Sequence, residues 1–169
     1  MSRRPEIRTE HLVLVPQTLE AGRALLDGAD PGLPLGEGYP HADTLDGLRM
    51  FVEHGAPDDG GWFVVLADDA DTAGAGLVVG DMGTFGPPDE HGRVEIGYGL
   101  AARYRGRGIG SEAVLAMVDW LAAQPDVRVV TASVEVGNEP SRRLLARLGF
   151  DLVDESDGHW HLERSVAIT

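Results

Sequence analysis

The sequence contains neither cysteine nor lysine, and it has no long apolar run. Without cysteine the chain can form no disulfide, no thiolate metal site and no cysteine nucleophile. Without lysine it lacks the phosphate-clamping residue of a nucleotide-hydrolysing P-loop. No stretch approaches the roughly 18 apolar residues of a membrane-spanning helix, and no apolar segment follows the N-terminal arginines. We therefore expect a cytoplasmic protein without a membrane partner.

Negative charge dominates the composition. Acidic residues outnumber basic ones by 28 to 14, which gives a formal net charge of −14. Because neutralisation of phosphates supplies most non-specific affinity for nucleic acids, we expect no nucleic-acid partner. A cationic partner suits this charge better. A compositional bias of the whole genome explains the same charge, so both explanations stay open at this stage.

The length of 169 residues fits one domain, which we expect to span residues 1–169. Hydrophobic periodicity and turn residues predict about seven strands and four helices in the order β-α-α-β-β-β-α-β-α-β-β. We expect an α/β (α+β) fold with a mixed, mostly antiparallel twisted sheet. The predicted elements are the strand 11–16, the helices 18–28 and 43–55, the strands 61–69, 73–86 and 93–101, the helix from 109 to before Pro125, the strand 127–137, the helix 139–150 and two short C-terminal strands.

A glycine-rich segment, RGRGIG, precedes the helix that begins near Ile109. Gly106, Gly108 and Gly110 carry no Cβ atoms and tolerate positive φ, so their amides can converge on one ligand. A helix N-terminus favours an anion, and Arg105 and Arg107 add positive charge there. The segment therefore predicts a phosphate or diphosphate site. A glycine-rich connection without a ligand is the alternative.

Two familiar phosphate-binding loops do not fit this segment. It is no P-loop, because Lys-Ser or Lys-Thr does not follow the last glycine. It is no dinucleotide-binding fingerprint either, since G-x-G-x-G differs from G-x-G-x-x-G and the preceding strand belongs to an antiparallel set.

At this point the residues carry a family resemblance. Residues 105–110 match the Arg/Gln-x-x-Gly-x-Gly/Ala signature of the GNAT superfamily of acyl-CoA-dependent N-acyltransferases. The segments VEIGYGL (residues 94–100) and NEPSRRLLARLGF (residues 138–150) resemble the branch of the ribosomal-protein N-terminal acetyltransferases, RimJ and RimL. The predicted order of elements is similar to the GNAT fold.

The resemblance implies transfer of an acyl group, most often acetyl, from coenzyme A to an amine. It implies that the amides of Arg105, Gly106, Arg107, Gly108, Ile109 and Gly110 hold the diphosphate of acetyl-CoA. The backbone of Tyr98, Gly99 and Leu100 would pair with the pantetheine arm. Asn138 matches a position that contacts the pantetheine or thioester region, and it is equally a helix N-cap.

Acyl transfer needs a group at the departing thiolate and a group that deprotonates the ammonium. Many relatives use a tyrosine seven positions after the asparagine, but this chain has Leu145 there. Ser141 matches the serine of the RimJ/RimL branch and is expected to donate a hydrogen bond to the sulfur, or else to be an ordinary first-turn serine. Glu95 and Glu135 are candidate bases acting through water, with Glu95 favoured; structural carboxylates are the alternative.

The acceptor region carries weaker signals. Six acidic residues are candidates for an acidic entrance, and a solvated helix face explains them as well. They are Asp43, Asp46, Glu53, Asp58, Asp59 and Asp81. The candidate lining residues are Tyr39, His41 and Trp62.

We expect no metal, because His159 and His161 share a strand face without carboxylate partners. We expect a small-molecule amine or a protein N-terminus as the acceptor. A non-catalytic acyl-CoA-binding module of the same fold is the rival hypothesis. The C-terminal edge strands also suggest a homodimer.

Overall fold

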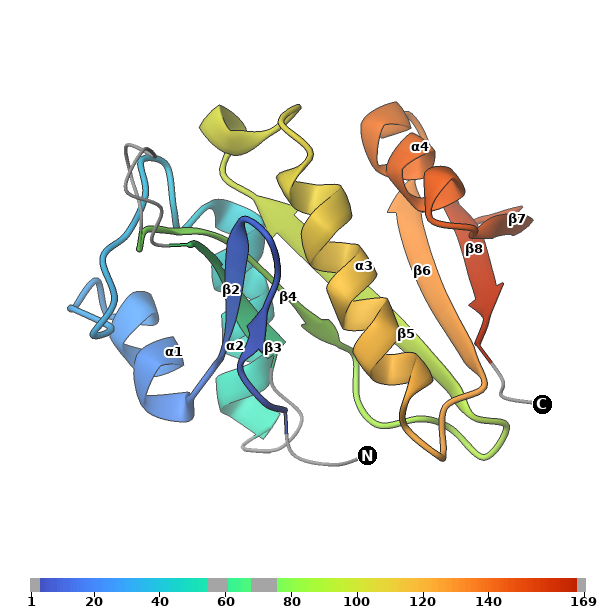
Figure 1. The fold of residues 1–169 in the computed structure, drawn as a ribbon, viewed down its shortest axis with the longest axis horizontal. Coiled ribbons are helices and arrows are strands. Elements are labelled where there is room, and N and C mark those ends of the chain that lie inside the picture. Colours follow the sequence, from blue (N-terminus) through green and yellow to red (C-terminus); the bar gives the residue numbers. More distant parts are fainter. Residues whose placement is uncertain (1–3, 55–60, 68–75, 167–169) are drawn as a thin grey trace.

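The structure is a computed structural model, and it describes residues 4–54, 61–67 and 76–166. The described residues form one eight-stranded sheet in the order β1-β2-β3-β4-β5-β6-β8-β7, with four α-helices (Figure 1). The strands are β1 (Ile7–Arg8), β2 (Leu12–Pro16), β3 (Gly61–Leu66), β4 (Val78–Thr84), β5 (Arg93–Leu100), β6 (Val129–Glu135), β7 (Asp151–Ser156) and β8 (His159–Ser165). The helices are α1 (Leu19–Leu26), α2 (Ala42–His54), α3 (Ile109–Ala122), α4 (Glu139–Arg147) and the 3-10 helix η1 (Ala102–Tyr104).

The sheet is mostly antiparallel, as the sequence predicts. Only the pair β5 and β6 is parallel, because α3 lies between them in the chain and returns β6 to the same direction. The predicted fold class is confirmed, including the meander of β3, β4 and β5. β1 and η1 were not predicted, because they have two and three residues and therefore show no periodicity.

The alternation of side chains along the strands decides which helix covers which face. Trp62 of β3 is fully buried and packs edge-on against Trp120 of α3, with ring centroids 5.2 Å apart. Asp81 of β4 points to the other face, where Thr44 of α2 donates a hydrogen bond to it. The sheet is therefore covered by α3 on one face and by α2 on the other, and the apolar core lies between these layers.

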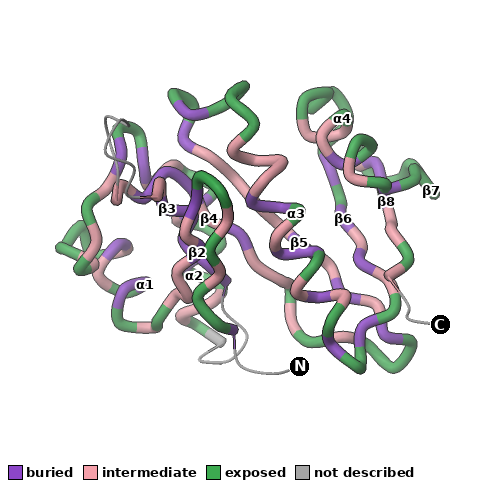
Figure 2. Tube along the Cα trace, in the orientation of Figure 1, coloured by how far each residue is buried: buried purple, intermediate pink, exposed green. Residues whose placement is uncertain are grey.

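The burial pattern follows from this arrangement. Figure 2 shows buried residues along the central strands and exposed residues along β7 and the outer side of α4. Every residue of β7 is exposed, including Leu152 and Val153. Of the two C-terminal strands expected at the edge, only β7 is an edge strand; the segment 158–166, which carried the expectation, contains β8 and lies between β6 and β7. The predicted homodimer stays a prediction. Among the described helices, none is long and apolar enough to cross a membrane.

Candidate active site

The central feature of the site is a split between the neighbouring strands β5 and β6. The two strands pair from Arg93 with Val129 to Ile96 with Ala132, and no further. Beyond this point β5 pairs only with β4, and β6 pairs only with β8. Figure 1 shows the two strands diverging towards the end at which α3 and α4 begin. The sheet therefore opens in its middle.

The backbone of β5 presents hydrogen-bonding groups to this split. The N–H of Phe85 donates to the carbonyl of Glu95, and the N–H of Ala101 donates to the carbonyl of Val79. The odd-numbered residues of β5 therefore direct their polar backbone groups to β4, and Tyr98 and Leu100 direct theirs into the split. The Nε of Arg105 already donates to the Leu100 carbonyl, at 3.1 Å. The groups that face the split are then the N–H and C=O of Tyr98 and the N–H of Leu100.

Two hydroxyl groups meet at the split. The hydroxyl of Tyr98 lies 2.5 Å from the Oγ of Ser141, which α4 carries in its first turn. Burial raises the pKa of Tyr98, and the hydrogen bond with Ser141 offsets part of this shift. Tyr98 is therefore a neutral phenol, able to donate a proton in a hydrogen bond, across the physiological pH range.

Helix α4 is fixed at its start by Asn138. The Oδ1 of Asn138 accepts a hydrogen bond from the N–H of Ser141 at 3.4 Å, so the N-cap expectation for Asn138 is confirmed. Arg142 stacks over the ring of Trp160 in β8, at 4.3 Å from the ring centroid. Leu145 is fully buried in the core, so this position of α4 faces away from the split.

The glycine-rich segment has the backbone that the sequence predicts. Gly106 and Gly108 have φ of +75° and +81°, and no atom lies within 4 Å of the position of a Cβ at either residue. Gly110 serves another purpose, because a Cβ there would lie 3.1 Å from a methyl carbon of Leu144 in α4. Helix α3 begins at Ile109 without a side-chain cap, so its first amides are open to an anion.

The arginines of this segment differ in their contacts. Arg105 holds the end of β5 through its hydrogen bond to Leu100. Arg107 lies over the ring of Tyr104, at 6.0 Å, and both Arg105 and Arg107 are exposed to solvent. Their positive charge therefore remains available beside the start of α3.

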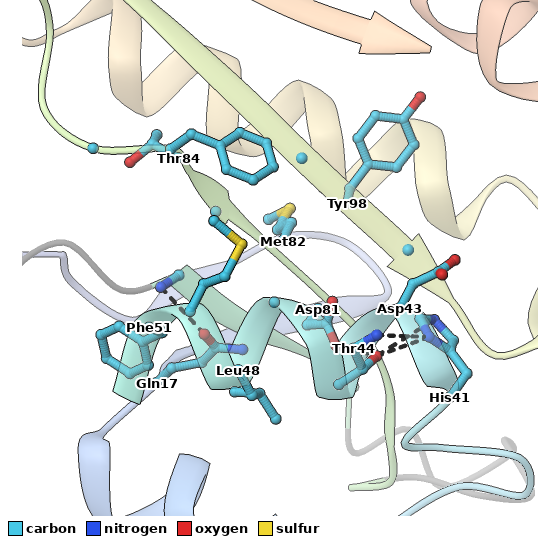
Figure 3. Close-up of a pocket in the computed structure, with 18 residues that line it drawn as sticks. Gln17, His41, Asp43, Thr44, Leu48, Phe51, Asp81, Met82, Thr84 and Tyr98 are labelled. Carbon is cyan, nitrogen blue, oxygen red and sulfur yellow. Dashed lines mark hydrogen bonds between the residues drawn. The ribbon is translucent and has the colours of Figure 1, made fainter. Parts of the chain in front are cut away.

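A cavity of about 580 Å³ lies between α2 and the sheet (Figure 3). It reaches β5 at Gly97, Tyr98 and Gly99, which is the level of the strand split. A Cβ on Gly97 would lie 2.9 Å from the ring of Phe85, and one on Gly99 would lie 3.0 Å from the Nε2 of His41. The two glycines therefore leave room for these rings beside the strand.

The expectations for the acceptor region hold only in part. His41 lines the cavity, and Tyr39 reaches it through a hydrogen bond to Asp81. Trp62 as a lining residue was wrong, because its side chain points to the opposite face and packs against α3. Its indole N–H donates to the carbonyl of Pro5 at 2.8 Å.

The acidic residues likewise separate into groups. Asp43 and Asp81 line the cavity, whereas Asp46 is exposed and pairs with Arg49 at 2.7 Å. Glu53 is exposed on α2. The predicted entrance residues Asp58 and Asp59 lie outside the described residues.

Glu95 lies in a second cavity of about 530 Å³, on the sheet face that α3 and α4 do not cover. The other charged groups of this cavity include the ion pair of Arg93 and Glu163. Phe85 lines both cavities, so its ring stands between Glu95 and the cavity beneath α2. Glu135 is exposed at the end of β6, and its carbonyl accepts the N–H of Asn138.

His159 and His161 share a strand face as predicted, with ring centroids 6.4 Å apart, and His161 contacts Ser133 and Ser156. The absence of a metal stays a prediction. Within the described part of the chain, one group of three residues brings metal-binding atoms within 4.8 Å of one another, namely Glu10, His11 and Glu112. The carboxylate of Glu112 already accepts hydrogen bonds from Thr9 and from the backbone of His11.

Two side chains of the site were not predicted from the sequence. Tyr98 was predicted to contribute only its backbone, and Asp81 was one of six undistinguished acidic residues. Alternation along β5 carries a signal for Tyr98, because it alone among residues 97–99 has a side chain. No pattern in the sequence singles out Asp81.

Comparisons with known proteins agree with this geometry. The family model described as acetyltransferase (GNAT) domain matches residues 12–151. The uncharacterized N-acetyltransferase YjdG of Bacillus subtilis is 29% identical over 128 residues, which are 73% of each chain. A solved structure from Bordetella pertussis, assigned to the GnaT family of acetyltransferases, has a TM-score of 0.66 and 25% identity and covers 95% of this chain and 99% of its own. Mycobacterium smegmatis RimJ, solved in complex with CoA-disulfide, has a TM-score of 0.61 and 21% identity, covering 91% of this chain and 81% of its own.

Proposed function

This chain belongs to the acetyltransferase (GNAT) family and is an N-acetyltransferase, and we propose that it acetylates a primary amine by direct attack on the thioester of acetyl-CoA. The observation that carries this proposal is the strand split with the hydroxyls of Tyr98 and Ser141 at its edge. The bound thioester supplies an acyl carbon that an amine can attack and a thiolate leaving group. The residues of this chain bind the cofactor, orient it and hold protons near the sulfur.

The start of α3 fits a diphosphate. The unobstructed space at Gly106 and Gly108 lets an anion approach the backbone, and the uncapped amides at Ile109 and Gly110 point to the same end of the helix. Arg105 and Arg107 add positive charge. We assign the diphosphate of acetyl-CoA to this segment.

The strand split fits the pantetheine arm. An extended amide chain added beside β5 would find the N–H and C=O of Tyr98 and the N–H of Leu100 at the spacing of a strand edge. Gly99 directs its backbone to β4, so its proposed contribution is the missing side chain that makes room beside His41. Asn138 holds the first turn of α4, which lies at the far side of the split.

At the sulfur we propose a hydroxyl pair. If Tyr98 donates its proton to the Oγ of Ser141, the single proton of Ser141 is directed elsewhere, towards the departing thiolate. Tyr98 is then a positioning residue, and Ser141 is the group that contacts the sulfur. The pair would take the place of the tyrosine that relatives carry at the position of Leu145.

For the proton of the ammonium, the sequence offers Glu95 and Glu135. Glu135 is exposed at the end of β6, and Glu95 lies in the second cavity beyond Phe85. From these places, each carboxylate would act through water.

The acceptor remains a choice between a protein N-terminus and a small cationic amine. Membership of the RimJ/RimL branch would favour a protein N-terminus as the acceptor. The likeness to RimJ is a likeness of the fold. The acidic groups Asp43 and Asp81 in the cavity are compatible with either, because both acceptors are cations before they react.

A thiol-release assay tests the proposal. We expect free thiol to appear from acetyl-CoA when a panel of polyamines, aminoglycosides, amino acids and short peptides with free N-termini is added. Calorimetry on the same sample measures binding of acetyl-CoA. Tight binding without turnover of any amine would favour the rival hypothesis of a non-catalytic acyl-CoA-binding module, and absence of binding would refute the proposed function.

A further inference from the structure

The carboxylate of Asp81 is held by two hydroxyl donors in the wall of the cavity beneath α2. The hydroxyl of Thr44 donates to Oδ2 at 2.6 Å, and the hydroxyl of Tyr39 donates to the same oxygen at 2.9 Å. In the part of the chain that the structure describes, no donor reaches Oδ1. One oxygen is therefore fixed by the protein, and the other remains available to a hydrogen-bond donor in the cavity.

His41 completes this corner of the cavity. Its Nδ1 accepts the backbone N–H of Thr44 at 3.1 Å, which makes His41 the N-cap of α2. The same Nδ1 lies 3.0 Å from the hydroxyl oxygen of Thr44, and the Nε2 of His41 lies next to Gly99. The polar groups of the cavity thus gather where it meets the strand split.

The other end of the cavity is mainly apolar, and the polar residue that Figure 3 shows there, Gln17, accepts the N–H of Gly61. Figure 3 shows His41, Thr44, Asp43 and Asp81 near one end of α2, with Leu48 and Phe51 further along the helix. Met50 and Phe85 also line the cavity. An occupant with a polar head and an apolar body matches this distribution.

We infer that the cavity binds a primary amine on an uncharged apolar stem, and that Asp81 binds the ammonium group and accepts its proton. This inference rests on the proposed acetyl transfer and names the acceptor class and the base. It differs from the sequence-based hypothesis of Glu95, which lies beyond Phe85 in the other cavity.

The proton and electron balance is simple. One N–H bond of the ammonium breaks, its proton moves to Asp81, and the electron pair left on nitrogen attacks the acyl carbon. After the attack the nitrogen is positively charged, and as the C–S bond breaks a second N–H bond of this nitrogen breaks as well. That proton passes to the departing thiolate, which leaves as the thiol beside Ser141. A neutral carboxylic acid remains at Asp81 and returns its proton to solvent through the open cavity after the product amide leaves.

The surroundings of Asp81 suit this exchange. Burial raises the pKa of Asp81, while the hydrogen bonds from Thr44 and Tyr39 and the nearby His41 lower it. The negative charge of Asp43 also raises the pKa of Asp81. The adjacent strands face Asp81 with Phe63 and Gly99, which carry no charge. A base whose pKa is raised towards neutrality accepts a proton more readily than an exposed aspartate does.

Three amines with the same six-carbon chain test the acceptor class: hexylamine, 1,6-diaminohexane and 6-aminohexanoate. We expect the kcat/KM of hexylamine to exceed the other two by about 10-fold or more, because a second charge would have to enter the apolar end. An equal or higher value for the diamine or the amino acid would overturn the apolar-stem assignment. If acetyl-CoA binds and other amines react while hexylamine does not, this inference fails and the proposed function stands.

Asp81→Asn tests the base. We expect kcat/KM for hexylamine to fall by about 100-fold, with unchanged binding of acetyl-CoA by calorimetry. The control is Asp46→Asn. It removes an exposed carboxylate from α2, the helix that covers the cavity, and should leave kcat/KM within about 2-fold. Near-normal activity of Asp81→Asn, together with loss of activity in Glu95→Gln, would return the role of base to Glu95.

Thr44→Val tests the role of Asp81 through the pH dependence of kcat/KM, which a merely structural role of Asp81 would not change. Loss of its hydroxyl removes a hydrogen bond that lowers the pKa of Asp81, so that pKa rises further. Because Asp81 must be ionised to accept a proton, the acidic limb of the pH profile of kcat/KM should shift to higher pH. An acidic limb at the same pH as in the wild type would overturn the assignment of Asp81 as the base.

Discussion

Gly108→Asp is expected to lower the affinity for acetyl-CoA by about 100-fold or more, which corresponds to roughly 3 kcal/mol of binding free energy. The substitution puts a carboxylate beside the uncapped amides at the start of α3. There the carboxylate repels the diphosphate and competes with it for the same donors. The φ of +81° adds strain to any residue with a Cβ. Calorimetric titration with acetyl-CoA measures the loss.

A matched variant distinguishes loss of the proposed phosphate site from a general effect of backbone strain. Gly28 also has a positive φ, of +68°, with no atom within 4 Å of its Cβ position, and it follows α1 far along the chain from α3. Gly28→Asp should therefore carry similar backbone strain and the same added charge while keeping the affinity for acetyl-CoA. If Gly108→Asp binds acetyl-CoA as well as Gly28→Asp does, the phosphate assignment is wrong.

Ser141→Ala is expected to lower kcat by about 100-fold while the dissociation constant of acetyl-CoA stays within about 3-fold. The hydroxyl is proposed to meet charge that develops on sulfur only as the C–S bond breaks, so its loss affects the transition state more than the bound ground state. Steady-state kinetics and calorimetry on one preparation separate the two quantities. Ser156→Ala, in the exposed strand β7, is the control and should retain full turnover.

Tyr98→Phe tells whether the two hydroxyls act together. If Tyr98 directs the proton of Ser141, removing its hydroxyl lowers kcat in the wild type and has little further effect in Ser141→Ala. Additive losses in the double variant would mean that Tyr98 acts independently of Ser141. Wild-type kcat in Ser141→Ala would leave Ser141 as a first-turn residue of α4 without a role at the sulfur.

Much of the fold could be predicted because helix caps and apolar periodicity favour the same helices and strands that tertiary packing stabilises. Thr18 accepts a hydrogen bond from the N–H of Ala21 and so caps α1, and Gly28 follows the helix with a positive φ; both residue types are typical of these positions. The apolar positions of α3 recur at helical spacing because one side of the helix lies on the sheet. β1 could not be found, since two residues cannot display an alternation.

The backbone of the glycine-rich segment could be predicted for the same reason, whereas the rest of the site depends on contacts distant in sequence. Tyr98 and Ser141 are 43 positions apart and meet only because β5 and β6 separate. His41 caps α2, although histidine is not among the preferred N-cap residues. Asp81 acquires its partners from α2 and from the loop before it, and neither contact leaves a pattern in the sequence of β4.

The strand split has a consequence for the exchange of backbone hydrogens with solvent. β5 is a central strand, but past Ile96 one side of it has no neighbouring strand. The amide hydrogens of Tyr98 and Leu100 should therefore exchange with deuterium as quickly as those of an edge strand, while the amide hydrogens of Val94 and Ile96 are protected. A ligand that completes the sheet would slow exchange at Tyr98 and Leu100, while exchange at Gly97 and Gly99, which already pair with β4, would change little. Two amides in the middle of the sheet would thus report occupancy of the proposed cofactor site without any chemical label.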